Sequence, residues 1–88
     1  MTGTELITEK VRTNREHKGY TAEHDATHDK SEMVEAAVCY LDNVLGLERA
    51  DWPFEVESWK PSDDPIRNLV HAGALIAAEI DRRQRQRG

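Results

Sequence analysis

Apolar side chains recur with the 3.6-residue period of an α-helix in three stretches of the chain, at about residues 4–17, 31–45 and 64–84. The first stretch carries only a narrow apolar stripe. The other two are apolar around a wide part of their circumference, which is typical of helices buried against other helices or another subunit. The pattern therefore predicts an all-α fold, a single three-helix domain over residues 1–88.

Residues that start and stop helices mark the first two stretches. Thr2 and Glu5 have the spacing of a capping box at the first helix. Ser31 is the expected N-cap of the second helix, with Asp29 as the alternative. Gly46 is well placed to end that helix in a left-handed conformation.

The third helix is predicted to start at Asp63-Asp64-Pro65, where a capping acid precedes a proline at the first helical position. Gly73 lies in mid-helix, where glycine costs about 1 kcal/mol relative to alanine, so we expect another helix to approach closely there. The residues expected on the inner side of the helix are Ile66, Leu69, Val70, Ala74, Leu75, Ile76, Ala77, Ala78 and Ile80.

An aromatic and proline-rich loop joins the second and third helices over residues 47–61. One interpretation is that Trp52, Phe54 and Trp59 close the open end of the helical core. The other is that aromatic faces and cationic or imidazole donors together hold a nucleobase and its phosphate. The candidate ligand-binding residues for that second interpretation are Tyr20, His24, Trp59, Arg67 and His71.

A cluster of possible metal ligands precedes the second helix. His24 and His28 would share one face if this segment is helical, with Asp25 beside them and Glu32 two turns further on. The alternative is that Asp25 and the two histidines cap helices and satisfy backbone groups of the loop.

Four carboxylates follow an ExxE and ExxD pattern, with Glu32 and Glu35 followed by Glu48 and Asp51. The spacing resembles the magnesium site of the MazG-like nucleotide pyrophosphohydrolases, in which paired acids hold Mg²⁺ against a triphosphate. Glu79 is a further carboxylate that could join such a site. Glu48 and Asp51 follow the Gly46 stop, and the chain has 17 acidic residues, so a chance match is the competing explanation.

Composition narrows the function classes. Residues 1–81 carry eight basic and 17 acidic side chains, a charge of −9, and a basic tail with four arginines follows at 82–88. An acidic body disfavours general nucleic-acid binding, and the arginines suit either an anion or the negative end of a helix dipole. The single cysteine, Cys39, excludes an internal disulfide and is expected in the core. No apolar stretch approaches the roughly 18–20 residues of a membrane span.

Several segments in this order resemble a widespread group of short bacteriophage and prophage proteins. They are GYTAEHDATH (19–28), AAVCY (36–40), WP (52–53), WKP (59–61) and RNLVHAGALIAAEI (67–80). The likeness spans about residues 12–83. It implies a phage accessory protein that acts in the host bacterial cytoplasm, and it carries over no catalytic residues. Ser31-Glu32-Met33 stands where the group often has Gly-Glu-Leu, and Asn68 where it often has Asp, which weakens a carboxylate-dependent catalytic interpretation.

Three functions are therefore considered. The leading one is a non-catalytic homo-oligomer, without cofactor, that counters host defence by sequestering a nucleotide-derived signal in a pocket between subunits. The second is a small MazG-like nucleotide pyrophosphohydrolase dependent on Mg²⁺. Zn²⁺ is the other metal considered, for the cluster of His24, Asp25 and His28. The third is direct inhibition of a host defence protein, such as a CRISPR complex, by the acidic surface.

Overall fold

The computed structural model describes residues 1–17, 31–48 and 51–87. Every regular element in these ranges is helical, which confirms the predicted all-α class for this part of the chain. The elements are α1 (Gly3–His17), α3 (Glu32–Val44), the short 3₁₀ helix η1 (Val56–Ser58) and α4 (Pro65–Arg87). None of the described helices is long and apolar enough to cross a membrane.

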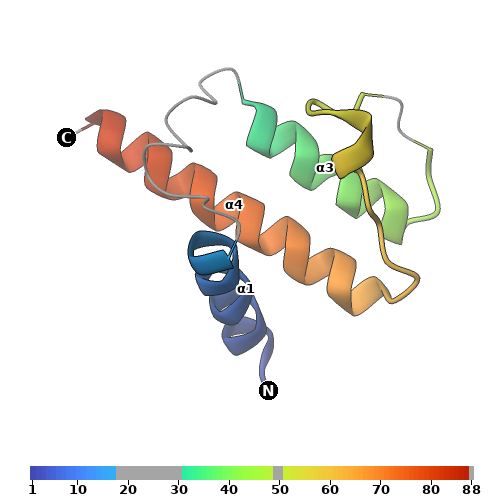
Figure 1. Ribbon diagram of the computed structural model, residues 1–88, viewed down its shortest axis with the longest axis horizontal. Helices are drawn as coiled ribbons and strands as arrows, with labels where there is room; N and C mark the ends of the chain where they lie inside the picture. The colour runs from blue at the N-terminus through green and yellow to red at the C-terminus, as the bar shows by residue number, and fades with distance from the viewer. Residues whose placement is uncertain (18–30, 49–50, 88) are drawn as a thin grey trace.

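Helix α4 is the centre of the molecule, and both other long helices pack on it (Figure 1). α3 runs antiparallel to α4, because Asn43 near its end bonds to Asn68 near the start of α4, while Ser31 at its start accepts a bond from Arg83 near the end of α4. α1 crosses α4 at a steep angle on another side. The three helices do not form a bundle in which each packs on the other two. Among the described elements, α1 and α3 both pack on α4 and not on each other.

Small side chains let α3 and α4 approach closely. Ala36 and Ala37 of α3, with Ala72 of α4, are at most 2% exposed. Tyr40 fills the space between them and is the largest fully buried side chain among the described residues. Cys39 is also buried, as predicted for a core residue. The core is therefore an alanine seam around one tyrosine ring.

Three of the predicted helix ends are confirmed by their hydrogen bonds. Thr2 and Glu5 form the capping box, each backbone N–H donating to the other side chain. Asp64 Oδ1 accepts from the Ile66 N–H at 3.0 Å, with Pro65 at the first helical position. Gly46 has a φ of +75° and ends α3 in a Schellman motif, whose outer bond runs from the Leu47 N–H to the carbonyl of Asp42.

The prediction for Ser31 was wrong in its detail. Ser31 precedes α3 with a φ of 67°, and its side chain makes no capping bond. Its Oγ instead accepts a hydrogen bond from Arg83 Nη2 at 3.4 Å, so it ties the start of α3 to α4. Its backbone carbonyl still accepts the first helical bond, from Glu35.

The inner side of α4 was also predicted wrongly in part. Ala74 is buried and Leu75 packs against the core, but the other four of the five largest aliphatic side chains expected there are between 45% and 59% exposed: Ile66, Leu69, Ile76 and Ile80. The reason is that α3 and α1 pack on two different sides of α4 and leave a third side uncovered. α4 also continues to Arg87, so the basic tail is the end of a helix.

The expected close approach at Gly73 is confirmed. A Cβ atom at this position would lie 2.6 Å from Cδ1 and 2.9 Å from Cγ1 of Ile7 in α1. The glycine therefore provides the hollow into which the side chain of Ile7 fits, and this steric fit sets where α1 crosses α4.

Candidate ligand-binding site

An aromatic cluster lies on one side of the α3–α4 pair, around the ring of Tyr40. His71 of α4 stacks on Tyr40 with ring centroids 4.2 Å apart and planes at 20°. Trp59 lies 4.8 Å from the same ring, and Trp52 meets it edge-on at 5.7 Å. Trp52 and Trp59 also contact each other at 4.8 Å. The cluster thus joins both long helices to the segment that connects them.

Hydrogen bonds around η1 hold Trp52 in place. Its Nε1 donates to the carbonyl of Glu55 at 3.1 Å and to Ser58 Oγ at 2.9 Å. The Ser58 hydroxyl donates in turn to the Glu55 carbonyl at 2.6 Å. Phe54 packs edge-on against Trp52 at 5.5 Å. The tight turn therefore fixes the indole ring, because both its polar and its apolar parts have partners.

Asn68 fastens the other end of the same segment. Its side chain is buried, accepts from the Ser62 N–H at 2.8 Å and donates to the Ser62 carbonyl at 2.8 Å. It also donates to Asn43 Oδ1 of α3 at 2.9 Å. A carboxylate could accept here but could not donate twice. The amide at position 68 therefore has a structural role.

The structure brings together two of the five candidate ligand-binding residues. Trp59 and His71 both contact Tyr40. Arg67 is exposed and precedes His71 by one helical turn, so the two share one side of α4. Tyr20 and His24 lie outside the described residues.

One basic residue of this region was missed by the sequence analysis. Lys60 follows Trp59 directly and is exposed. Its position next to a loop tryptophan could have singled it out. With Arg67 of α4, it gives the residues around the aromatic cluster two cations.

Two of the three aromatic residues expected to close the core, Trp52 and Trp59, lie against it. Trp52 and Trp59 pack against the buried cluster of Ala37, Tyr40 and Ala72. Both indoles remain partly exposed at the surface. The same residues can therefore close the core and present an aromatic edge to a ligand.

The proposed metal ligands His24, Asp25 and His28 lie outside the described residues. Within the ranges that the structure describes, no three His, Cys, Asp or Glu side chains are grouped so as to hold a metal ion.

The four carboxylates of the ExxE and ExxD pattern form no metal site among the described residues. Glu32 and Glu35 belong to the first turn of α3. Glu48 and Asp51 follow its last residue, Val44, and the chain then turns back, because Cys39 Sγ donates to the carbonyl of Asp51 at 3.9 Å. Within the part of the chain that the structure describes, no three of these carboxylates are grouped so as to hold a metal ion.

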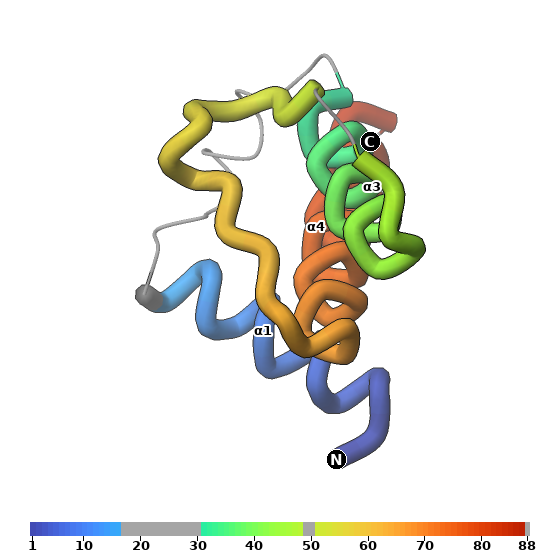
Figure 2. Tube along the Cα trace, turned by 90° about the vertical axis from the view of Figure 1, so that its right-hand side faces the viewer, coloured from blue at the N-terminus to red at the C-terminus, as the bar shows by residue number. Residues whose placement is uncertain are grey.

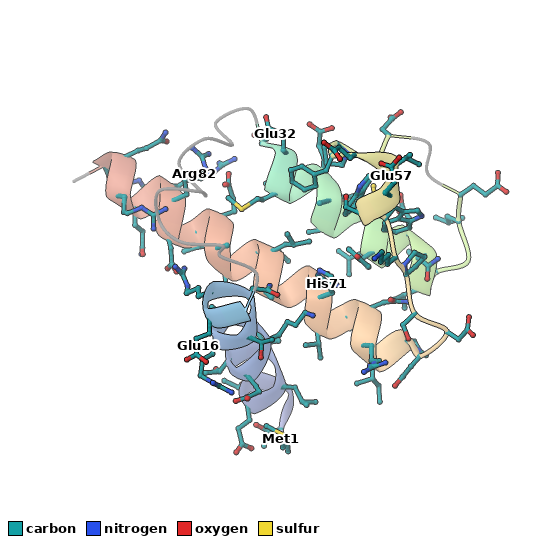
Figure 3. The ribbon with its side chains drawn as sticks, viewed as in Figure 1. Met1, Glu16, Glu32, Glu57, His71 and Arg82 are labelled. Carbon is teal, nitrogen blue, oxygen red and sulfur yellow. The ribbon has the colours of Figure 1, made fainter. Side chains whose placement is uncertain are left out.

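Glu79 is held in a buried ion-pair group on α4. Arg82 donates to both of its carboxylate oxygens, at 2.7 and 3.0 Å, and Arg83 donates to Oε2 at 2.7 Å. Hydrogen bonds from Arg82, reinforced by Arg83 and outweighing the effect of burial, lower the pKa of Glu79 to about 2. Figure 3 shows Arg82 at the same end of the α3–α4 pair as Glu32. Glu79 is therefore neutralised by arginines, which makes it a poor magnesium ligand.

The aromatic cluster, with Arg67 and Lys60 beside it in the chain, is thus the candidate site that the described residues support best. No protein-family model, curated protein or solved structure matches this chain.

Proposed function

We propose that this protein is a non-catalytic bacteriophage accessory protein that binds and sequesters a nucleotide-derived signal in the host bacterial cytoplasm, and so counters host defence. Trp59, Arg67 and His71 are the described residues of the site, and Tyr20 and His24 are further candidates outside the described residues. The three described residues belong to one chain, so we place the site within each copy, instead of between subunits as expected from the sequence. The binding needs no metal or other cofactor.

The observation that carries this proposal is the joint contact of Trp59 and His71 with Tyr40, on the side of α4 that also bears Arg67. Aromatic edges and faces suit a nucleobase, and an arginine fork suits a phosphate. Because the rings are fixed by the core and by the hydrogen bonds of η1, little ordering is required when a ligand binds.

Magnesium-dependent hydrolysis is a weaker explanation. No three acidic side chains of the described residues are grouped so as to hold a metal ion, and Glu79 is bonded to two arginines. A magnesium-dependent reaction needs carboxylates that converge on the metal.

The test is native mass spectrometry and calorimetry with a panel of linear and cyclic nucleotides, with and without Mg²⁺. We expect stoichiometric binding of an intact nucleotide that does not depend on Mg²⁺. Arg67→Ala should weaken binding roughly tenfold or more, since it removes a charge-assisted hydrogen bond. Arg87→Ala is the matched control, because it removes the same charge from the far end of α4 and should leave the affinity unchanged.

Shortened nucleotides that depend on Mg²⁺ would contradict the proposal and favour the hydrolase. Absence of nucleotide binding, together with a stable complex with a host defence protein, would favour direct inhibition by the acidic surface. An equal loss of affinity in Arg67→Ala and Arg87→Ala would show general charge attraction instead of a site.

A further inference from the structure

We propose that a second copy of this chain binds to the side of the α3–α4 pair that faces away from the aromatic cluster, with α3 of each copy lying antiparallel to α4 of the other. This inference is independent of the proposed function, because none of its residues belongs to the ligand-binding site.

Two matching stripes of exposed aliphatic side chains define this surface, which we call the apolar face. They are Val34, Leu41 and Leu45, from α3 and its C-cap, and Leu69, Ile76 and Ile80 of α4. Each stripe has the spacing i, i+7, i+11, so its members lie in one row along their helix. Their exposed fractions run from 37% to 72%, high for six large aliphatic side chains on two neighbouring helices.

Both stripes lie on the same side of the helix pair. On α3, Tyr40 faces α4, and Cys39, which bonds to the carbonyl of Asp51, faces the connecting segment. Around the axis of α3, Leu41 lies about 100° from Tyr40 on the side opposite to Cys39. The α3 stripe therefore faces away from the connecting segment. On α4, His71 faces the aromatic cluster, and the positions of Leu69 and Ile76 lie on the opposite side. Figure 2 shows residues 51–64 running along one side of the α3–α4 pair and leaving the other side uncovered.

Among the described residues, no other segment covers the apolar face, whose side chains remain exposed. α1 packs on a different side of α4 from the apolar face, where Ile7 fits against Gly73 and Arg15 approaches Asp81. Residues 18–30 contain no aliphatic side chain larger than alanine. A partner with aliphatic side chains would cover the apolar face.

Charge identifies that partner as a second copy. α3 carries three acidic residues and no basic one, whereas α4 carries five arginines and two acids. Arg82 is buried against Glu79, so the exposed arginines near the end of α4 provide the complementary charge. The exposed arginines Arg83 and Arg87 extend the α4 stripe toward the C-terminus at the same heptad spacing. A two-fold axis that places α3 of one copy along α4 of the other brings the acidic helix beside the basic one twice. Such self-complementarity is what an isologous dimer requires.

The relative direction of the helices follows from the same symmetry. Within one chain, the acidic start of α3 lies beside the arginine-rich end of α4. When the axis runs parallel to the helices, the antiparallel order is repeated between copies, and the result is a four-helix bundle with alternating directions. The stripes then interlock along their length, with Val34 near Ile80 and Leu45 near Leu69 of the other copy.

The first test is the solution mass, measured by sedimentation of the full chain at micromolar concentrations. We expect about 20 kDa, twice the 10.0 kDa of the chain, for a two-fold dimer. Ile76→Glu should weaken self-association roughly a hundredfold or more, because it places a charge in the centre of the apolar face. Val56→Glu is the matched control, since Val56 is 75% exposed in η1, outside the apolar face, and it should leave the dimer intact.

Circular dichroism should show unchanged helix content in both variants, because each side chain is exposed within a single chain. A wild-type monomer would overturn the proposal, and so would an Ile76→Glu variant that remains a dimer or a Val56→Glu variant that dissociates equally.

The second test concerns the arrangement of the helices. A mixture of Leu45→Cys and Leu69→Cys proteins should form a disulfide-linked dimer under mild oxidation, while either protein alone should not. The native Cys39 is buried and does not interfere. Efficient cross-linking of Leu45→Cys alone would overturn the arrangement, because it would place α3 against α3.

Discussion

The two helices that pack on α4 do so in different ways. α3 buries five residues and shares with α4 an alanine seam, a buried tyrosine and an aromatic cluster. α1 contributes one buried residue among its described side chains, Asn14, whose Oδ1 has no hydrogen-bond partner within the described structure. The comparison shows that α3, α4 and their connecting segment form the frame that positions the site, and that α1 is attached to this frame.

The ion pairs of α4 also differ between its two contacts, in how far they are buried and how closely they are bonded. Glu79 and Arg82, near the start of α3, are both 5% exposed and joined by two hydrogen bonds. Asp81 and Arg15, at the contact with α1, are 49% and 34% exposed and 3.5 Å apart. A desolvated, bidentate pair is sensitive to the loss of one partner, whereas a solvated pair contributes little.

Truncation of Tyr40 should show the largest difference in stability between the α3–α4 contact and the α1–α4 contact. Tyr40→Ala is expected to lower the free energy of unfolding by about 3–5 kcal/mol, because it empties the centre of the aromatic cluster. Ile7→Ala, on the α1 contact, should cost about 2 kcal/mol, at the low end for such a truncation, since Ile7 is only partly buried. Urea denaturation measures both. Equal costs would contradict the view that α1 is an attachment.

Removal of the acidic partner should give the next largest effect. Glu79→Ala leaves Arg82 buried without its carboxylate and should cost about 3 kcal/mol or more, whereas Asp81→Ala should cost less than about 1 kcal/mol. Thermal unfolding of both variants at neutral pH provides the measurement. If Asp81→Ala loses as much stability as Glu79→Ala, the buried Glu79–Arg82 pair is not the more important of the two ion pairs.

The same pair predicts a pH dependence. The pKa of Glu79 is lowered from 4.5 to about 2, so its contribution to the free energy of unfolding is complete above pH 4.5 and is lost as the pH falls toward 2. Glu79→Gln should flatten this part of the stability curve. If the wild type and this variant lose stability in parallel below pH 4.5, other carboxylates account for the loss.

The smallest effect should appear at the hollow under Ile7. Gly73→Ala places a Cβ atom 2.6 Å from Ile7 Cδ1 and should cost about 1–3 kcal/mol through overpacking. In an Ile7→Ala background the same substitution should stabilise the protein by about 1 kcal/mol, because alanine favours the helix. The change of sign in a double-mutant cycle is the readout. Stabilisation in the wild-type background would show that Ile7 moves aside at no cost.

The helix ends could be predicted because their signals are local. The capping box of Thr2 and Glu5, the stop at Gly46 and the start at Asp64-Pro65 each depend on residues within one turn of each other. Gly73 could be predicted for a similar reason, since a glycine within a helix of alanines indicates a close neighbour. The neighbour itself, Ile7, could not be predicted.

The faces of α4 could not be predicted, because the helix is apolar on several sides and the sequence does not say which of them meet another helix. Leu69 and Ile76 have the same periodicity as buried residues, yet they lie on the apolar face. The burial of Glu79 and Arg82 was missed for the opposite reason, since charged residues near a helix end are usually solvated. Their register, one heptad after Ala72 and Leu75, was the available signal.

The most direct test of the whole account is native mass spectrometry of the full chain with the nucleotide panel. We expect a dimer of about 20 kDa that gains the mass of intact ligand, with one site on each copy because the aromatic clusters face away from the two-fold interface. A monomer that gains no ligand at any nucleotide concentration would contradict both the binding site and the apolar face.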